Sequence, residues 1–275
     1  MHVVLAIAGS DSSGCAGLQA DIRAISANGC HAATVVTCVT AQSSLRLTAL
    51  FPVPADIVRN QLDVVFADLL VDAVKSGVFG SVEAVEAVAE VLRVRPLPYV
   101  LDPVMAATAG GGLSSASVAA AMCDQLFPLA TLLTPNALEA EALTGMRVRD
   151  RAEAARAGQA LLESGCRAVL VKGGHLADDP CVDVLVERSG QAVFEATPIP
   201  NPNTRGTGCT LASAIAAHLA RGRSLHEAVE RGRAHLRTAI GGGYALPGGG
   251  PVDAFAHYRQ LSEEPLARAT EPSHA

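Results

Sequence analysis

The feature that most constrains this chain is an alternation of short apolar runs with longer segments of helical periodicity. Repeated strand–helix units of this kind predict a mainly parallel sheet with helices on both of its faces. We therefore expect an α/β fold. The strand-like runs lie at 3–9, 33–41, 72–77, 98–104, 130–136, 167–174, 182–187 and 192–197. The helix-like segments lie at 18–28, 54–69, 81–94, 137–143, 149–165, 209–222 and 224–240.

The two runs at 182–187 and 192–197 are separated by a short turn that contains Arg-Ser-Gly. This spacing is typical of a β-hairpin, so one edge of the sheet is expected to be antiparallel. Neither an internal repeat nor a long linker divides the chain. We expect residues 1–260 to form a single domain, followed by a disordered tail at 261–275.

Composition excludes several classes of function. The formal net charge is −6, basic residues are scattered singly and Trp is absent, so a nucleic-acid partner is not expected. No apolar stretch reaches the ~20 residues that a membrane span needs. Seven dispersed cysteines without C-x-x-C spacing, and no signal peptide, predict free thiols in a reducing cytoplasm.

Polar residues gather where the predicted strands end. Asp11, Asp102, Asn136 and Lys172 each follow a strand-like run, and the loop 203–209 precedes a helix. Ligands of open α/β sheets bind outside the carboxyl ends of the strands. This shared placement predicts one binding site built from all five segments.

The loop NTRGTGC (203–209) runs directly into an apolar helix-like segment. Gly206 and Gly208 would allow a tight backbone turn, and the free N–H groups at the helix start would then attract an anion. A strand-to-helix turn without a ligand is the alternative, and we favour the anion site. The loop is neither a Walker loop nor a dinucleotide fingerprint, because Leu211 occupies the last glycine position of the latter.

Cys209 stands at the start of that helix. A buried thiol is often only a small core residue. A helix N-terminus, however, lowers the pKa of a thiol and so favours a reactive role, which a nearby phosphate would oppose.

Three further candidates allow two interpretations each. Asn136 and Glu139 could order Mg²⁺ or its water shell, or could simply cap a helix. Lys172, beside two glycines, could hold a phosphate or be a solvated turn residue. Asp102, before a proline, could be a turn former.

Six motifs occur in a particular order: AGSDSSGCAGLQAD, VTAQSS, DPVM, LTPNALEAEAL, VKGGH and NTRGTGCT. In these the chain resembles the hydroxymethylpyrimidine/phosphomethylpyrimidine kinases of thiamine biosynthesis, from about residue 4 to residue 258. The resemblance implies a ribokinase-like three-layer αβα sandwich, the cofactors ATP and Mg²⁺, and a homodimer. It also implies two successive phosphorylations of 4-amino-5-hydroxymethyl-2-methylpyrimidine, first to the monophosphate and then to the diphosphate.

The resemblance further implies a role for each matching residue. The catalytic group would be an anion hole at Gly206, Thr207 and Gly208, with Cys209 as the base that faces the substrate hydroxyl. Many ribokinase-like sugar kinases have Asp at that position. The pyrimidine pocket would be lined by Gly9, Ala16, Asp21, Gln42, Val78 and Val104. Lys172, Asn136, Thr204 and Arg205 would hold the phosphates, and Glu139 and Asp102 would hold the metal, directly or through water.

Four positions depart from the pattern of the family. Cys15 replaces a glycine in the first turn, Gln42 is followed by Ser43 and Ser44 in place of Asn-Thr, Val78 replaces a methionine, and Arg205 replaces a histidine. These departures leave open a pyridoxal kinase of the same superfamily, with Gln42 and Val78 as the discriminating residues. A non-catalytic pyrimidine-binding relative is the third reading, and the intact loop and Cys209 argue against it. The Gly-rich segment 108–113 is the candidate for a lid.

Overall fold

The computed structural model describes residues 1–43, 45–105, 114–173, 181–256 and 258. Ser44, the predicted lid at 108–113 and the predicted tail at 261–275 lie outside these residues. The single-domain boundary at residue 260 therefore stays a prediction.

One nine-stranded sheet, in the order β3-β2-β1-β4-β5-β6-β7-β8-β9, runs through the described residues. The strands from β2 to β7 along this order are parallel, whereas β3 pairs antiparallel with β2 at one edge. At the other edge β8 and β9 form the expected hairpin, and β8 also runs antiparallel to β7. The sheet thus has antiparallel strands at both edges, whereas the sequence predicted them at only one edge. The strands are β1 (Val3–Asp11), β2 (His31–Gln42), β3 (Leu47–Pro52), β4 (Ala73–Ser76), β5 (Tyr99–Leu101), β6 (Leu132–Leu133), β7 (Ala168–Val171), β8 (Asp183–Glu187) and β9 (Gly190–Phe194).

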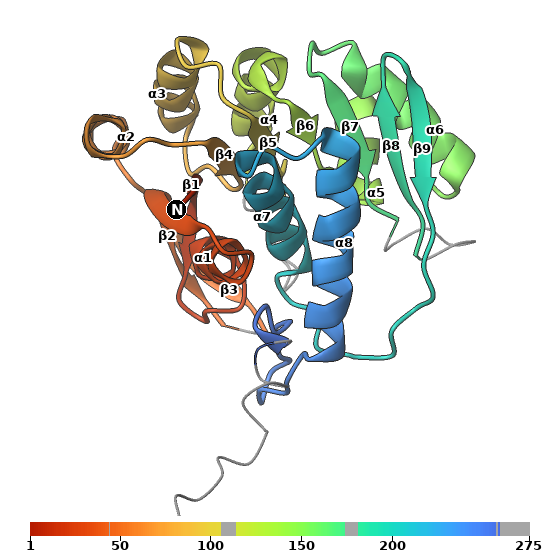
Figure 1. The fold of residues 1–275 in the computed structure, drawn as a ribbon. Coiled ribbons are helices and arrows are strands. Elements are labelled where there is room, and N and C mark those ends of the chain that lie inside the picture. Colours follow the sequence, from red (N-terminus) through yellow and green to blue (C-terminus); the bar gives the residue numbers. More distant parts are fainter. Residues whose placement is uncertain (44, 106–113, 174–180, 257, 259–275) are drawn as a thin grey trace, which may run out of the picture.

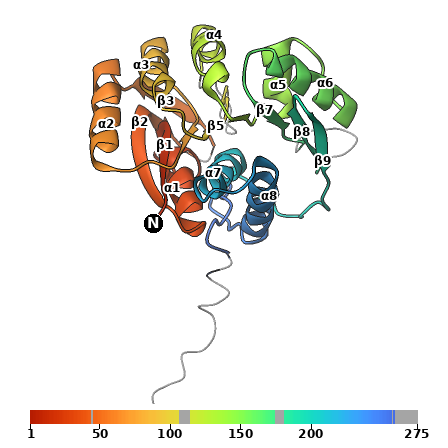
Figure 2. The same ribbon diagram turned by 45° about the horizontal axis from the view of Figure 1, so that its top comes forward.

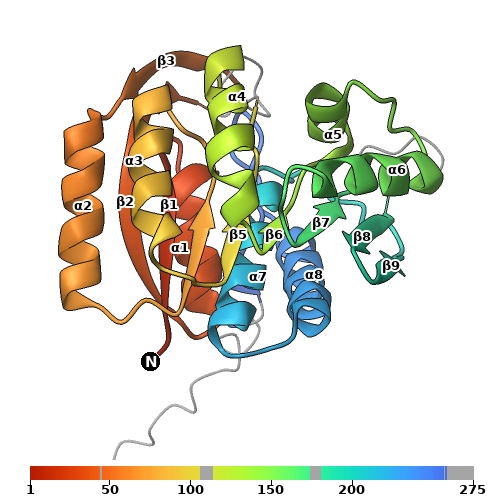
Figure 3. The same ribbon diagram turned by 90° about the horizontal axis from the view of Figure 1, so that it is seen from above.

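Helices cover both faces of the sheet, as Figure 2 shows. One face carries α2 (Ala55–Asp68), α3 (Val82–Arg93), α4 (Ala116–Gln125), α5 (Ala137–Thr144) and α6 (Arg151–Leu162), and a short 3₁₀ helix, η1 (Phe127–Leu129), follows α4. The opposite face carries α1 (Gly17–Ala27), α7 (Thr207–Ala220) and α8 (Leu225–Gly241). Figure 3 shows α5 and α6 beside the β7–β9 end of the sheet. The three-layer αβα prediction is confirmed.

Each layer has its own hydrophobic core, and the strands serve both. Leu5 and Ile7 of β1 pack under one set of helices, whereas Val4 and Ala6 pack under the other. Alternate side chains of a strand point to opposite faces, so a strand buried on both faces becomes a continuous apolar run. This is why the central strands were recognisable from composition alone.

Helix α7 lies in the middle of its layer, beside α8 in Figure 1, and packs against α1 and the strands β1, β4 and β5. It is apolar around almost its whole circumference, and every residue from Thr210 to Ala220 is buried. Gly232 of α8 allows a close approach, because a Cβ there would lie 2.6 Å from Cγ1 of Ile215. The packing fixes the N-terminus of α7 at the carboxyl ends of the central strands.

Two elements have no counterpart in the prediction from sequence. Edge strand β3 has no buried residue and therefore lacks the alternation of a half-buried strand. Helix α4 has a weak apolar stripe, although Ser115 caps it by accepting a hydrogen bond from the Val118 amide. None of the helices in the described part of the chain is long and apolar enough to cross a membrane.

Candidate active site

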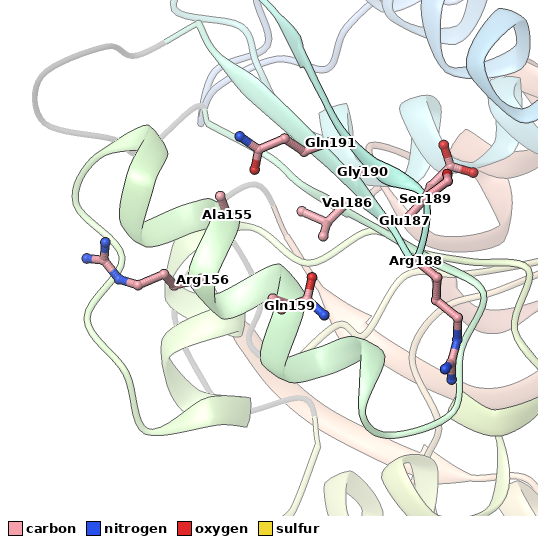
Figure 4. Close-up of a pocket in the computed structure, with 9 residues that line it drawn as sticks. All are labelled: Ala155, Arg156, Gln159, Val186, Glu187, Arg188, Ser189, Gly190 and Gln191. Carbon is pink, nitrogen blue, oxygen red and sulfur yellow. The ribbon is translucent and has the colours of Figure 1, made fainter.

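A cavity of about 820 Å³ opens at the carboxyl ends of the strands, beside the N-terminus of α7. Fifteen of the predicted site residues line it: Gly9, Ala16, Gln42, Val78, Asp102, Val104, Asn136, Glu139, Lys172, Thr204, Arg205, Gly206, Thr207, Gly208 and Cys209. A second depression of about 470 Å³ lies between α6 and the β8–β9 turn, and Figure 4 shows Arg156 and Arg188 at its opposite ends. None of the predicted residues lines that depression, so the larger cavity is the candidate site.

The two glycines of the 203–209 loop lie in close contacts, and the first of them is required by its backbone conformation. Gly206 has a φ of 78°, in the left-handed region, and a side chain there would collide with the carbonyl oxygen of Cys15. A Cβ at Gly208 would lie 3.3 Å from both Asp102 Oδ2 and Lys172 Nζ. The loop is therefore held between the first turn of the chain and the Asp102–Lys172 pair.

The start of α7 has no side-chain cap and no acid in its first turn. Ser, Asn or Asp side chains cap α3, α4, α5, α6 and α8, whereas α2 and α1, which also begins at the cavity, lack a side-chain cap as α7 does. Uncapped amides at a helix start, together with the helix dipole, favour a bound anion. This start of α7 could receive an anion, and the anion site stays a prediction.

The first turn of the chain is organised by Asp11. Its carboxylate accepts hydrogen bonds of 2.8 Å from the amides of both Ser13 and Ala16. Asp11 therefore shapes the loop that carries Ala16 into the cavity. At the end of the same strand, a Cβ on Gly9 would lie 2.6 Å from Cys38 Sγ and 2.7 Å from Val78 Cγ1, so only glycine fits there without displacing its neighbours.

Asp102 and Lys172 form an ion pair at the ends of β5 and β7. Lys172 Nζ lies 2.8 Å from Asp102 Oδ1, which also accepts a 3.2 Å hydrogen bond from the Thr134 hydroxyl. Burial opposes the charged form of Lys172, but the carboxylates of Asp102 and Glu139 raise its pKa above the ordinary value. Lys172 is thus a fixed cation that keeps part of its side chain exposed.

Glu139 and Asn136 form a capping box at the start of α5. The Asn136 side chain accepts from the Glu139 amide at 2.9 Å, and the Glu139 carboxylate accepts from the Asn136 amide at 2.8 Å. Burial raises the pKa of Glu139 to about 7, with Asp102 adding to the rise and Lys172, at 3.9 Å, opposing it. The capping interpretation is confirmed, and the carboxyl group remains one that a nearby cation would ionise.

The pKa of Cys209 differs from the expectation. Burial raises it to about 11, Lys75 lowers it, and Asp21 and Asp102 raise it further. The predicted lowering at the helix start is therefore wrong, because removal of water from the sulfur raises the pKa more than Lys75 and the Gly17 backbone lower it. Cys209 is a neutral thiol at neutral pH.

Asp21 does not face the cavity as predicted. Its side chain is fully buried, with Oδ1 2.7 Å from Lys75 Nζ and 2.8 Å from the Ser213 hydroxyl. Lys75 itself lines the cavity, so the lysine stands between Asp21 and any ligand. Asp21 lies one turn into α1, which begins at Gly17, and its carboxylate is turned toward Lys75 of β4 and Ser213 of α7.

Lys75 was missed, although a signal was present. It lies within the apolar run DAVKSG, in a central strand whose faces are both covered. A lysine at such a position needs a buried acid, since a charge is costly to bury without a partner. The sequence could not identify that acid, because Asp21 lies 54 residues away.

The far end of the cavity was also missed. Beyond Lys172 the wall continues with Asp183, Arg233 and Leu236. Arg233 Nε donates to Asp183 at 2.6 Å, and the other oxygen of Asp183 accepts from the Gly173 amide. This network connects α8 to the strand end that carries Lys172. No pattern of residue spacing in the sequence predicts it.

The chain matches the family model described as phosphomethylpyrimidine kinase over residues 11–253. It is 44% identical to the hydroxymethylpyrimidine/phosphomethylpyrimidine kinase of Rhizobium meliloti (strain 1021), over 92% of this chain and 97% of that protein. Among solved structures, an ADP complex of Bacillus subtilis pyridoxal kinase superposes with a TM-score of 0.87 at 33% identity, covering 94% of this chain and 99% of that one. The phosphomethylpyrimidine kinase of Clostridium difficile 630 gives a TM-score of 0.78 at 36% identity, with coverages of 87% and 100%.

Proposed function

Because the chain belongs to the phosphomethylpyrimidine kinase family, we propose that its cavity brings a hydroxymethylpyrimidine and ATP together for phosphoryl transfer in thiamine biosynthesis. The observation that carries this proposal is the uncapped, glycine-bounded start of α7, which includes Cys209 and lies against the Asp102–Lys172 pair. An acceptor hydroxyl at Cys209 and a phosphate at the helix amides would be neighbours there.

In the reaction, the hydroxyl oxygen of the substrate bonds to the γ-phosphorus of ATP, and the bond from that phosphorus to ADP breaks. The monophosphate then accepts a second phosphoryl group to become the diphosphate. The amides at Gly206, Thr207 and Gly208 would stabilise the charge on the group in transfer. Positioning and charge stabilisation carry most of the rate in such reactions.

Cys209 would orient the hydroxyl and accept its proton. A thiol with a pKa of about 11 is a weak acceptor at neutral pH, because few molecules hold the thiolate. The transition state of phosphoryl transfer is loose, so little deprotonation is needed before attack. Activity should rise with pH in the alkaline range as the thiolate fraction grows.

Lys172, Asn136, Thr204 and Arg205 would hold the phosphates of ATP. Arg205 is largely buried, and its backbone is fixed by hydrogen bonds to Gly250 and Val252. Phosphate contacts would replace part of the Asp102–Lys172 ion pair. The apolar wall beyond Lys172, with Leu236 and Ile240, would receive the nucleoside.

Asp102 and Glu139 fit Mg²⁺ that is bound through its water shell. Magnesium keeps several waters and takes one or two carboxylates together with substrate phosphates. No group of three or more His, Cys, Asp or Glu that could hold a metal occurs among the described residues, as this mode of binding would allow. When bound, the ion would neutralise the charge of the phosphates.

Gly9, Ala16, Gln42, Val78 and Val104 would enclose the pyrimidine. The Gln42 side chain offers both a donor and an acceptor to the aminopyrimidine edge. Pyridoxal kinase is the second candidate, because a pyridoxal kinase is among the solved structures with this fold. Gln42 favours the aminopyrimidine, whereas Val78, in place of a methionine, is neutral to mildly adverse to it.

We also propose a homodimer and a cytoplasmic location. Val39 and Phe51, which pair across β2 and β3, are exposed apolar residues near the edge of the sheet, where a second copy could cover them. All seven cysteines are free thiols, as is usual in a reducing compartment.

The test measures ATP consumption with hydroxymethylpyrimidine and with pyridoxal, on the wild type and on Cys209→Ala. Turnover of the pyrimidine that is lost in the variant supports the proposal. Preference for pyridoxal moves the function to vitamin B6 salvage. Binding of the pyrimidine without turnover in the wild type indicates a non-catalytic relative, and full activity of the variant removes Cys209 as the base.

A further inference from the structure

Three segments meet at one buried ion pair below the cavity. Lys75 comes from the central strand β4, Asp21 from α1 and Ser213 from α7, and none of the three side chains is exposed. Asp21 Oδ1 accepts from both Lys75 Nζ, at 2.7 Å, and the Ser213 hydroxyl, at 2.8 Å. These two bonds aim the carboxylate and fix the position of the ammonium.

The pair lies directly under Cys209. Ser213 follows Cys209 by four residues in α7, so the two side chains share one face of that helix. Asp21 likewise follows Gly17 by four residues in α1, and the Gly17 backbone hydrogen-bonds the Cys209 thiol. Both helices therefore place the network one turn below the sulfur.

Lys75 is also next to the cavity. Lys75 and Gly77 both line it, and a Cβ on Gly77 would lie 3.1 Å from Lys75 Nζ. Glycine at this position therefore keeps a side chain out of the space beside the ammonium.

Stability alone does not explain a buried ion pair. The cost of removing both charges from water consumes most of the attraction between them, and apolar side chains of similar volume usually serve as well. Ionisable groups that are buried beside a reactive side chain more often have a functional role.

We propose that Lys75 is a positioning residue for the phosphoryl transfer: its ammonium, aimed by Asp21 and Ser213, is a fixed positive charge that favours movement of the substrate hydroxyl proton to Cys209. The proposal rests on the role proposed above for Cys209. In this step the thiolate takes the hydroxyl proton while the oxygen bonds to the γ-phosphorus and ADP departs. The thiol later returns its proton to solvent.

The charges that face Cys209 come from four elements. Lys75 lies on β4 and Asp21 on α1, while Asp102 follows β5 and Lys172 follows β7. Among these, Lys75 is the strongest influence that lowers the pKa of Cys209, whereas Asp21 and Asp102 raise it. Removal of Lys75 should therefore leave a thiol that ionises less readily.

The first experiment measures how fast iodoacetamide alkylates Cys209 between pH 7 and 10, followed by mass spectrometry of the Cys209 peptide without substrate. The main variant is Lys75→Met/Asp21→Leu, which removes both charges together and so avoids a lone buried ion. We expect alkylation of Cys209 at pH 8 to slow about threefold, or about half a pKa unit, because the loss of Lys75, the stronger influence, is partly offset by the loss of Asp21, which raises the pKa. We also expect kcat to fall with little change in KM.

Lys75→Gln is the second variant, in case the double variant does not fold. It keeps a hydrogen-bond donor to Asp21 but removes the positive charge, so alkylation should slow in the same direction. Tyr99→Phe is the matched control, because it removes a buried 2.6 Å hydrogen bond to Ser76, the neighbour of Lys75, without touching the cavity. In this control, the rate at which Cys209 is alkylated and the kcat should both equal those of the wild type.

Wild-type alkylation and kcat in either folded charge-removed variant would overturn the proposal. So would an equal slowing in Tyr99→Phe, which would indicate a general loosening of the strand. Alkylation needs no substrate, so this test remains informative if the proposed reaction fails. Full activity in Cys209→Ala would instead refute the role of Cys209 as proton acceptor. The measured effect of Lys75 on the alkylation of Cys209 would still stand.

Discussion

Two lysine–carboxylate pairs flank the start of α7, and they differ in one respect. In each pair a carboxylate oxygen accepts from a lysine and from a hydroxyl: Asp21 from Lys75 and Ser213, and Asp102 from Lys172 and Thr134. The Asp21–Lys75 pair is fully buried, whereas the Lys172 side chain is 13% exposed. The first pair is closed to exchange of partners, and the second is open to it.

This difference separates two uses of the same chemistry. A closed pair holds a constant charge next to the acceptor end of the cavity. An open pair can give its lysine to a phosphate and its carboxylate to a hydrated cation, and can re-form when the products leave. We expect mutations in the closed pair to affect mainly stability and the state of the thiol, and mutations in the open pair to affect mainly the use of ATP.

The largest expected effect is on the stability of the closed pair. Asp21→Leu leaves Lys75 buried without its carboxylate, so the free energy of unfolding should fall by about 3–5 kcal/mol. Urea denaturation followed by circular dichroism measures it. The additional change Lys75→Met should restore most of the loss, and a single variant as stable as the wild type would show that Lys75 has another buried partner.

The open pair should respond in activity. Lys172→Met removes the cation that would face the phosphates, so kcat/KM for ATP should fall about 100-fold, or ~2.7 kcal/mol of transition-state stabilisation. The free energy of unfolding should change by only about 1 kcal/mol, since the cavity can hydrate Asp102. Steady-state kinetics and urea denaturation of the same preparation measure both effects. A large loss of stability with normal kinetics would show that the open pair does not differ from the closed pair in this way.

Glu139 next to the open pair makes stability depend on pH. Its folded pKa of about 7 exceeds the ordinary value of 4.5, so between these values the folded state holds a proton that the unfolded state has released. The carboxyl group therefore makes the wild type less stable as the pH rises from 4.5 to 7. Glu139→Gln keeps the capping box and removes this cost, so it should be ~3 kcal/mol more stable than the wild type at pH 8 and about equal at pH 4.5. The same difference at both pH values would contradict the raised pKa.

The smallest expected effect compares the two hydroxyls. Ser213→Ala removes a 2.8 Å bond to the buried Asp21 carboxylate, and Thr134→Val removes a 3.2 Å bond to Asp102. We expect a loss of about 1.5 kcal/mol for the first and about 0.5 kcal/mol for the second. Thermal unfolding of both variants measures the two losses of stability. A larger loss in Thr134→Val than in Ser213→Ala would argue against stronger hydrogen bonding in the closed pair.

The sequence predicts that Asp102 and Lys172 of the open pair lie at one site, although not that they form an ion pair, and it does not predict the closed pair. Asp102 and Lys172 each follow an apolar run, and the ends of parallel strands meet at one edge of the sheet. Lys75 lies inside its strand, and its two partners belong to helices that are distant in the chain. Only the three-dimensional packing shows that Asp21 contacts the lysine and not the ligand.

The pKa of Cys209 shows a second limit of prediction from the sequence. Its place at a helix start was visible in the sequence, and so was the dipole that lowers a thiol pKa. The burial that reverses this effect depends on how α1 and the first turn cover the sulfur. Edge strand β3 escaped for a related reason, because it buries no residue and so leaves no pattern.

The central place of α7 has a consequence for synthesis of the chain. This helix packs against β1, β4 and β5, yet it is made long after them, and its bond from Ser213 to Asp21 joins residues 192 positions apart. Until the ribosome has released residues 207–220, the early strands lack the helix that covers one of their faces, and the buried ion pair lacks its hydroxyl. The N-terminal half of the chain therefore cannot complete its core during translation and depends on its last quarter to finish folding.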